Sequence, residues 1–139
     1  MKKTLLALSM AFGAAAAQAE EPQSVTVTLS SGSTMTQGMA MVLANQMQEQ
    51  NAQVDILLCD EAGKIALKNA AGETLKPNNV TPTQLLDAAI KKGATASVCA
   101  LFLPNSGYNS DDLREGVSVA RPQDMAAKLL EPNRKHINF

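Results

Sequence analysis

The sequence predicts an α/β domain built on an open, mostly parallel, doubly wound sheet of about five strands, with helices on both faces. The first observation behind this prediction is that short apolar or β-branched runs alternate along the chain with segments of helical periodicity. The second is that these runs are short and separated by helix-length segments, as in βαβ units. Such sheets place their ligands at the carboxyl ends of the strands.

The N-terminus predicts a signal peptide at residues 1–19. Lys2 and Lys3 are followed by an uncharged apolar core at 5–17, and Ala17-Gln18-Ala19 fits the small-x-small rule for cleavage after Ala19. The apolar core is shorter than the ~20 residues that cross a bilayer. No cysteine follows the apolar core, so this is not a lipoprotein signal. The short, Ala-rich form looks bacterial and predicts a periplasmic protein.

The predicted mature chain, residues 20–139, has the length of a single domain. Loss of Lys2 and Lys3 changes the formal net charge from −1 to −3. A mildly acidic domain lacks the positive surface that nucleic acid or anionic lipid attracts. We therefore expect no nucleic-acid partner and no membrane association after cleavage.

The first half of the mature chain contains two predicted strands and a long helix. The alternation in SVTVTLS predicts a strand at 24–30, and the Gly/Ser turn at 31–34 leads into a helix at 35–50. The apolar run VDILLC predicts a second strand at 54–59, followed by a short helix at 63–69 and a loop at 70–80. The apolar residues expected to face the core from the first helix are Met35, Met39, Val42, Leu43 and Met47.

The second half continues the alternation. Thr81-Pro82 predicts a helix start, and Gly93 predicts its end after about Lys92. Strands are predicted at 95–99 and 117–120, with a short turn capped by Ser110 between them. A last helix begins at Pro122, and an edge strand is predicted at 136–139. The apolar face of that last helix consists of Met125, Ala126, Leu129 and Leu130.

Both cysteines of the chain fall at predicted strand ends, Cys59 on the second strand and Cys99 on the third. An even cysteine count in an exported protein favours a disulfide. However, the strand order 2-1-3 puts the first strand between them, which is ~9.6 Å for two strand spacings. A disulfide needs Cα atoms within ~7 Å, so we expect no disulfide. The residues alone leave Cys99 as a small core hydrophobe, a disulfide half or a reactive thiol.

The segment around Cys99, GATASVCALFLPNSGYNSDDLREGV at 93–117, resembles the DsrE/DsrF-like family of small sulfur-relay proteins. The matching features are a helix-ending Gly93, a strand-ending Cys99, Gly107, Leu113 and the pair Gly116-Val117. The segments VDILLCDEAGKIALKN and MAAKLLEPNRKHINF are also similar to the family's second strand with its helix and to its last helix with its edge strand. The resemblance implies a DsrE-like fold with a flavodoxin-like strand order.

The chemistry that the resemblance implies is persulfide transfer on Cys99, which would make the protein at most a sulfurtransferase or sulfur carrier. A position between a strand end and a helix start lowers a thiol's pKa through backbone N–H groups, and we expect this for Cys99. The implied partners are sulfur donor and acceptor proteins or small thiols, and the implied assembly is a homo-oligomer, trimer or hexamer. Cys59 is a possible secondary thiol.

Two positions depart from the family pattern. Many relatives have Pro directly after the cysteine and a second cysteine three residues on, where this chain has Ala100 and Phe102. We therefore expect no nearby resolving thiol, so that sulfur would pass to another molecule. The same substitutions support an alternative, a non-catalytic binding or assembly module that keeps the fold.

Two further groups of residues are candidate sites. Ser31, Gly32, Ser33 and Thr34, after Ser30, could form an anion-binding or nucleotide-binding loop, but a helix-capping turn is the preferred interpretation. The methionines of the first helix, Met35, Met39, Met41 and Met47, suggest copper, but a core stripe with Met41 off its face is favoured. We expect no flavin, metal or other cofactor.

Overall fold

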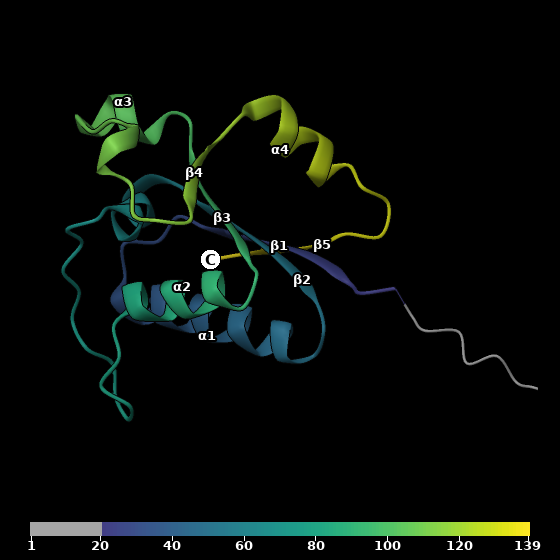
Figure 1. The fold of residues 1–139 in the computed structure, drawn as a ribbon, viewed down its shortest axis with the longest axis horizontal. Coiled ribbons are helices and arrows are strands. Elements are labelled where there is room, and N and C mark those ends of the chain that lie inside the picture. Colours follow the sequence, from purple (N-terminus) through teal and green to yellow (C-terminus); the bar gives the residue numbers. More distant parts are fainter. Residues whose placement is uncertain (1–20) are drawn as a thin grey trace, which may run out of the picture.

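The computed structural model describes residues 21–139, and residues 1–20, with the predicted signal sequence, lie outside the described part (Figure 1). The elements run in the order β1 (Ser24–Leu29), α1 (Thr34–Glu49), β2 (Gln53–Leu58), η1 (Asp60–Ala66), α2 (Pro82–Lys91), β3 (Thr95–Cys99), α3 (Phe102–Ser106), η2 (Ser110–Asp112), β4 (Val117–Ala120), α4 (Pro122–Leu129) and β5 (Lys135–Asn138), where η marks a 3₁₀ helix.

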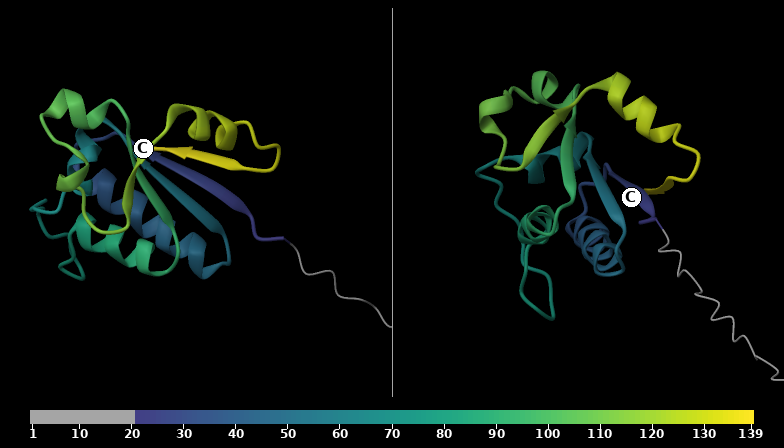
Figure 2. Two further views of the ribbon diagram at one scale, coloured as in Figure 1. Left: turned by 45° about the horizontal axis from the view of Figure 1, so that its top comes forward. Right: turned by 45° about the vertical axis from the view of Figure 1, so that its right-hand side comes forward.

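The predicted fold class is confirmed, because five parallel strands form one sheet with helices on both faces. The predicted order of the strands is wrong: the sheet runs β4-β3-β2-β1-β5, so β2 lies beside β3 and β1 does not separate them. Helices α1 and α2 cover one face, and α4 lies over the other (Figure 2). Since parallel crossovers are right-handed, α4, which returns the chain from β4 to β5 at the opposite edge, falls on the opposite face.

The sheet has one apolar and one polar face. Val27, Ile56 and Val98 lie on the side of α1 and α2 and belong to the core. Their neighbours along the strands, such as Thr26 and Asp55, point to the side of α4, because side chains alternate along a strand. The strictly alternating sequence of β1 therefore belongs to a strand that buries apolar side chains on one face of the sheet and polar side chains on the other.

Most element boundaries follow the sequence signals closely. Helix α2 begins with a capping box in which Thr81 Oγ1 accepts from the Gln84 N–H, and Gln84 Oε1 accepts from the Thr81 N–H. The short helix expected at 63–69 begins earlier, as η1 at Asp60. The helix start expected after Cys99 belongs to α3, a single short helix whose FLPNS segment has too few residues for a periodic pattern; Gly107, at φ 74°, ends it.

The expectation that Met35 and Met39 face the core is wrong. Their exposures are 75% and 55%, whereas Met41 is fully buried. The inward side of α1 instead carries small residues, and a Cβ added at Gly38 would overlap Leu75 Cδ1. Helix α1 thus packs closely by its small residues and Met41, whereas Met35 and Met39 remain outside.

Polar side chains of α1 fix this orientation. Asn45 Nδ2 donates to the Leu85 carbonyl at 2.9 Å, and Gln48 Nε2 donates to the Ala89 carbonyl at 3.1 Å. Both carbonyls belong to α2. These bonds hold the two helices side by side over the apolar face of the sheet.

The predicted apolar face of α4 also remains largely outside the core. None of the residues of α4 is buried, and Leu130, which follows it, is 82% exposed. The contact between α4 and the sheet is made instead by the Lys128 ammonium, which donates to Asp55 Oδ1. Helix α4 is therefore attached to the polar face by charge.

Asp55 is the centre of a buried polar cluster on this face. Its Oδ2 accepts from Arg134 Nη1 at 2.5 Å, and its Oδ1 accepts from Lys128 and from the Thr95 hydroxyl. The Arg134 side chain is only 6% exposed and also contacts Glu131 at 2.8 Å. Burial by itself would raise the pKa of Asp55, but the hydrogen bonds from Lys128, Thr95 and Arg134 outweigh it and lower the pKa.

We predict that Asp55→Asn destabilises the domain by about 3 kcal/mol, because the buried Arg134 loses its buried charged partner and keeps only the more exposed Glu131. Since the folded pKa of Asp55 is lowered, its stabilising contribution is complete above the ordinary carboxyl value and is lost as pH falls through the folded value. The variant should lack this acid-dependent component. Urea unfolding at neutral and acid pH measures both effects.

The control is Asp124→Asn, which removes the exposed Arg121–Asp124 pair. That pair should contribute no more than about 1 kcal/mol. Equal losses in the two variants would contradict the role assigned to Asp55.

Candidate functional site: the cysteine pair at the carboxyl edge of the sheet

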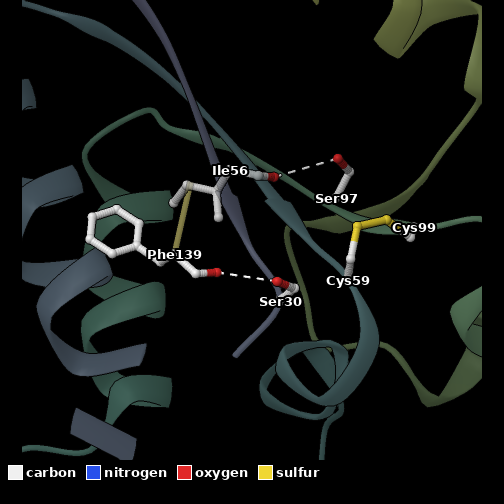
Figure 3. Close-up of a disulfide and its surroundings, with 6 residues drawn as sticks. All are labelled: Ser30, Ile56, Cys59, Ser97, Cys99 and Phe139. Atoms are coloured by element: carbon white, nitrogen blue, oxygen red, sulfur yellow. Dashed lines mark hydrogen bonds between the residues drawn. A yellow bond between two sulfur atoms is a disulfide. The ribbon is translucent and has the colours of Figure 1, made fainter. Parts of the chain in front are cut away.

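The pairing of β2 with β3 brings the two cysteines together. Leu58 pairs with Val98 in the parallel register, so Cys59 and Cys99 are the next residues on neighbouring strands. Their Cα atoms are 5.1 Å apart, and their sulfur atoms form a disulfide (Figure 3). The expectation of no disulfide is wrong, because it rested on the order 2-1-3, which doubled the distance between the strands.

The disulfide lies at the carboxyl edge, toward the polar face of the sheet. Cys99 follows Thr95 and Ser97 at intervals of two residues on β3, and Cys59 stands in the same relation to Asp55 beyond the end of β2. Both cysteines are half-buried. The bridge is therefore at the edge where sheets of this kind bind ligands, with part of its surface open to solvent.

Backbone and hydroxyl groups hold the strand ends around the bridge. The Cys59 N–H donates to the Leu29 carbonyl at 2.9 Å, which fixes the end of β2 to β1. In Figure 3, the Ser97 hydroxyl donates to the Ile56 carbonyl at 3.5 Å, just before Cys99 on β3. The Ser30 hydroxyl donates to the Phe139 carbonyl at 3.2 Å, on the other side of β1. The positions of both cysteines are thus set by the sheet.

The bridge also restricts the unfolded chain. It joins residues 40 positions apart. In the chain-entropy model, a loop of that length contributes about 4 kcal/mol to stability. The disulfide is therefore a structural link as well as a chemical group.

The charges next to the two cysteines differ. Cys59 is followed by Asp60 and Glu61, which open η1. Cys99 is followed by uncharged residues. Glu61 is paired with Lys64, so Asp60 is the charge that distinguishes the surroundings of the two cysteines. A carboxylate repels negative charge on a nearby sulfur, so Asp60 opposes an anionic sulfur at Cys59.

Phe102 lies three residues after Cys99, where the resemblance to the DsrE/DsrF-like family implies a second cysteine in many members. It is 6% exposed, and its ring lies directly against Gly63 of η1, where an added Cβ would come within 2.5 Å of it. Phe102 thereby fixes α3 against η1. The second thiol comes instead from Cys59 on the neighbouring strand, so the expectation that no resolving thiol lies nearby is wrong. The sequence does not show that Cys59 and Cys99 are neighbours, because they are 40 residues apart and meet only through the pairing of β2 with β3.

A separate cavity of about 500 Å³ lies beside the cysteine pair. Gly32 and Thr34 line it together with residues of η1, the following loop and the start of α2, but neither cysteine does. Ser33 Oγ accepts from the Thr36 N–H at 3.4 Å, as expected of a helix-capping turn. The Ser31 carbonyl accepts a hydrogen bond from Gln37 Nε2 at 2.9 Å.

The cationic groups of this cavity are bound to acceptors of the protein itself. Lys64 Nζ lies 2.5 Å from Glu61 Oε2, and Lys68 Nζ donates to the Asp111 carbonyl at 2.6 Å. Both lysines of the lining are therefore engaged within the protein, and the lining also carries the carboxylates of Glu73 and Asp112. Within residues 21–139, no group of three or more His, Cys, Asp or Glu side chains is placed to hold a metal ion. In the same range, no helix is long and apolar enough to span a bilayer.

The order of the parallel strands and the placement of the helices define the DsrE/YchN-like fold. The YchN protein of Escherichia coli superposes with a TM-score of 0.69 and 16% sequence identity over 86% of this chain and 100% of its own. MTH1491 of Methanobacterium thermoautotrophicum, a protein of unknown function, gives a TM-score of 0.62 and 13% identity over 84% and 98% of the two chains. No family model and no curated protein sequence matches the chain. At these low sequence identities, the structural similarity shows a shared fold only.

Proposed function

We propose that this protein is a periplasmic sulfur-relay protein that carries sulfane sulfur as a persulfide on Cys99. The observation that carries the proposal is the half-buried cysteine pair at the carboxyl edge of a DsrE/YchN-like sheet. The edge supplies access, and the neighbouring charges favour the anionic sulfur at Cys99 over Cys59. Only a thiolate attacks sulfur readily, so this asymmetry selects Cys99 as the carrier.

Each transfer step is an exchange at sulfur. The Cys99 thiolate attacks the outer sulfur of a donor persulfide, R–S–SH, giving Cys99–S–SH and the donor thiolate. An acceptor thiolate then attacks the outer sulfur on Cys99, takes it, and restores the Cys99 thiolate. Both steps conserve atoms and electrons, and the reaction needs a donor and an acceptor thiol but no metal or flavin. The donors and acceptors are proteins or small thiols.

The test of this proposal is uptake of sulfur by the reduced protein from a small persulfide donor such as glutathione persulfide. Cys59→Ser should gain one sulfur atom at Cys99, detected by intact mass after alkylation and by peptide mapping. Cys99→Ser should gain none, either at the substituted position or at Cys59. The two variants are matched controls for each other, because each removes the same disulfide and only Cys99→Ser removes the proposed carrier sulfur. If Cys59→Ser gains no sulfur, the relay proposal fails and the alternative of a non-catalytic binding module takes its place.

Export is the second element of the proposal. It rests on the basic start, the apolar core and the Ala17-Gln18-Ala19 site in the sequence, and it is supported by a disulfide, since such bonds persist in oxidising compartments. We predict that N-terminal sequencing of the protein from the periplasmic fraction begins at Glu20. An intact Met1 on protein recovered from the cytoplasm would contradict export.

Assembly is the third element. Helix α1 exposes Met35, Met39, Val42 and Leu43 along one side, and it contains no charged residue before Glu49. An exposed apolar patch on a helix without charges is typical of an interface. A second copy of the chain fits it, because the same uncharged stripe on each partner can meet about a two-fold axis and bury no unpaired charge. Of the two expected assemblies, a trimer has no two-fold axis, whereas a hexamer built from two trimers has such axes and therefore such contacts.

We predict that light scattering at micromolar concentration finds a hexamer and that Met39→Lys reduces it to a smaller species by placing a charge in the contact. The control is Leu130→Lys, which alters an even more exposed hydrophobic residue away from α1. A monomeric wild type, or equal masses for the wild type and Met39→Lys, would contradict this interface.

A further inference from the structure

We propose that the Cys59–Cys99 disulfide is itself the sulfur acceptor of the oxidised protein: hydrosulfide opens it and becomes the outer sulfur of a Cys99 persulfide. This inference rests on the proposed function and names a donor for it, inorganic sulfide. Its basis is that the resolving thiol, Cys59, is already bonded to the carrier sulfur.

The position of the bridge permits the attack. Both cysteines are half-buried at the carboxyl edge, so a small anion can reach the sulfur pair from solvent. The cysteines are held at a Cα separation of 5.1 Å by the pairing of β2 with β3, with Leu58 opposite Val98. Because the strands and not the bridge set this distance, the two sulfur atoms remain neighbours after the bond is opened. The same pair can therefore open and close without rearrangement of the sheet.

The step balances without a further oxidant or reductant. The sulfur of HS⁻ attacks Cys99 Sγ, a new S–S bond forms, and the Cys59–Cys99 bond breaks with its electron pair going to Cys59 Sγ. The proton of the hydrosulfide moves to Cys59, which leaves Cys59–SH and Cys99–S–S⁻. The disulfide is reduced by two electrons, and the sulfide is oxidised to sulfane sulfur. Charge is conserved at −1 on each side.

The neighbouring charges select the sulfur that retains the product. An anionic persulfide at Cys59 would lie next to the carboxylate of Asp60, whereas uncharged residues follow Cys99. Like charges repel, so the persulfide is favoured at Cys99 and the neutral thiol at Cys59.

The reverse reaction gives Cys59 a second role. If the Cys59 proton passes back to the outer sulfur, the Cys59 thiolate attacks Cys99 Sγ, expels HS⁻ and restores the disulfide. The carboxylate of Asp60 opposes negative charge on Cys59 and so protects the persulfide from this release. Cys59 is a positioning and resolving thiol, and Cys99 is the group that carries the transferred sulfur.

The experiment incubates the oxidised mature protein with sodium sulfide in the absence of oxygen, followed by alkylation. Mass spectrometry should show the gain of one H₂S per chain, an alkylated persulfide at Cys99 and an alkylated free thiol at Cys59. The wild type reduced beforehand has no disulfide and should gain no sulfur from hydrosulfide. Cys59→Ser should also gain none from hydrosulfide, although it should take sulfur from glutathione persulfide.

A second variant tests the selection between the two sulfurs. The substitution Asp60→Asn keeps the disulfide and removes the carboxylate next to Cys59. It should increase the fraction of persulfide found at Cys59, and it should accelerate release of HS⁻ from the loaded protein. An unchanged distribution and release rate would overturn the role assigned to Asp60.

The two proposals fail separately. A disulfide that resists hydrosulfide, or a wild-type persulfide located at Cys59, overturns the present inference. If Cys59→Ser still gains sulfur from glutathione persulfide, the relay function stands with another donor. If that gain is also absent, the relay function itself is overturned.

Discussion

The parallel pairing of β2 with β3 is the constraint on which the site of this protein depends. Once these strands are neighbours, the register that places Leu58 opposite Val98 makes Cys59 and Cys99 consecutive partners at the strand ends. Their Cα separation of 5.1 Å is within the range of a disulfide. The same pairing puts α1 and α2 on one face of the sheet, where Asn45 and Gln48 join them through the carbonyls of α2.

The two faces of the sheet are stabilised by different interactions. The apolar face is covered by α1 and α2, so burial of Val27, Ile56 and Val98 stabilises that side. The polar face is joined to α4 through the ion cluster of Asp55, Lys128 and Arg134. At the carboxyl edge of this face, both cysteines are half-buried, so part of the bridge is open to solvent although the core is closely packed.

Helix α1 shows that close packing can place small residues against the core and leave larger hydrophobic residues exposed. Its large apolar residues suggested a core face, yet the face that packs inward is formed by Gly38, Ala40 and Ala44 with Met41. Small residues allow α1 to approach Leu75 and the sheet closely, and polar residues satisfy the carbonyls of α2. The same packing leaves Met35 and Met39 exposed, on the surface at which we propose that a second copy of the chain binds.

The sequence by itself determined the alternation of strands and helices, the α/β class and the placement of both cysteines at strand ends. These features depend on local signals, such as the alternation in β1 and the capping of α2 by Thr81. The order of the strands, the disulfide and the inward face of α1 were decided by the tertiary structure. Strand order depends on which helices pack together, through contacts such as Asn45 with Leu85 that lie 40 residues apart in the chain. Local periodicity carries no information about such contacts, so only the assembled sheet could bring Cys59 to Cys99.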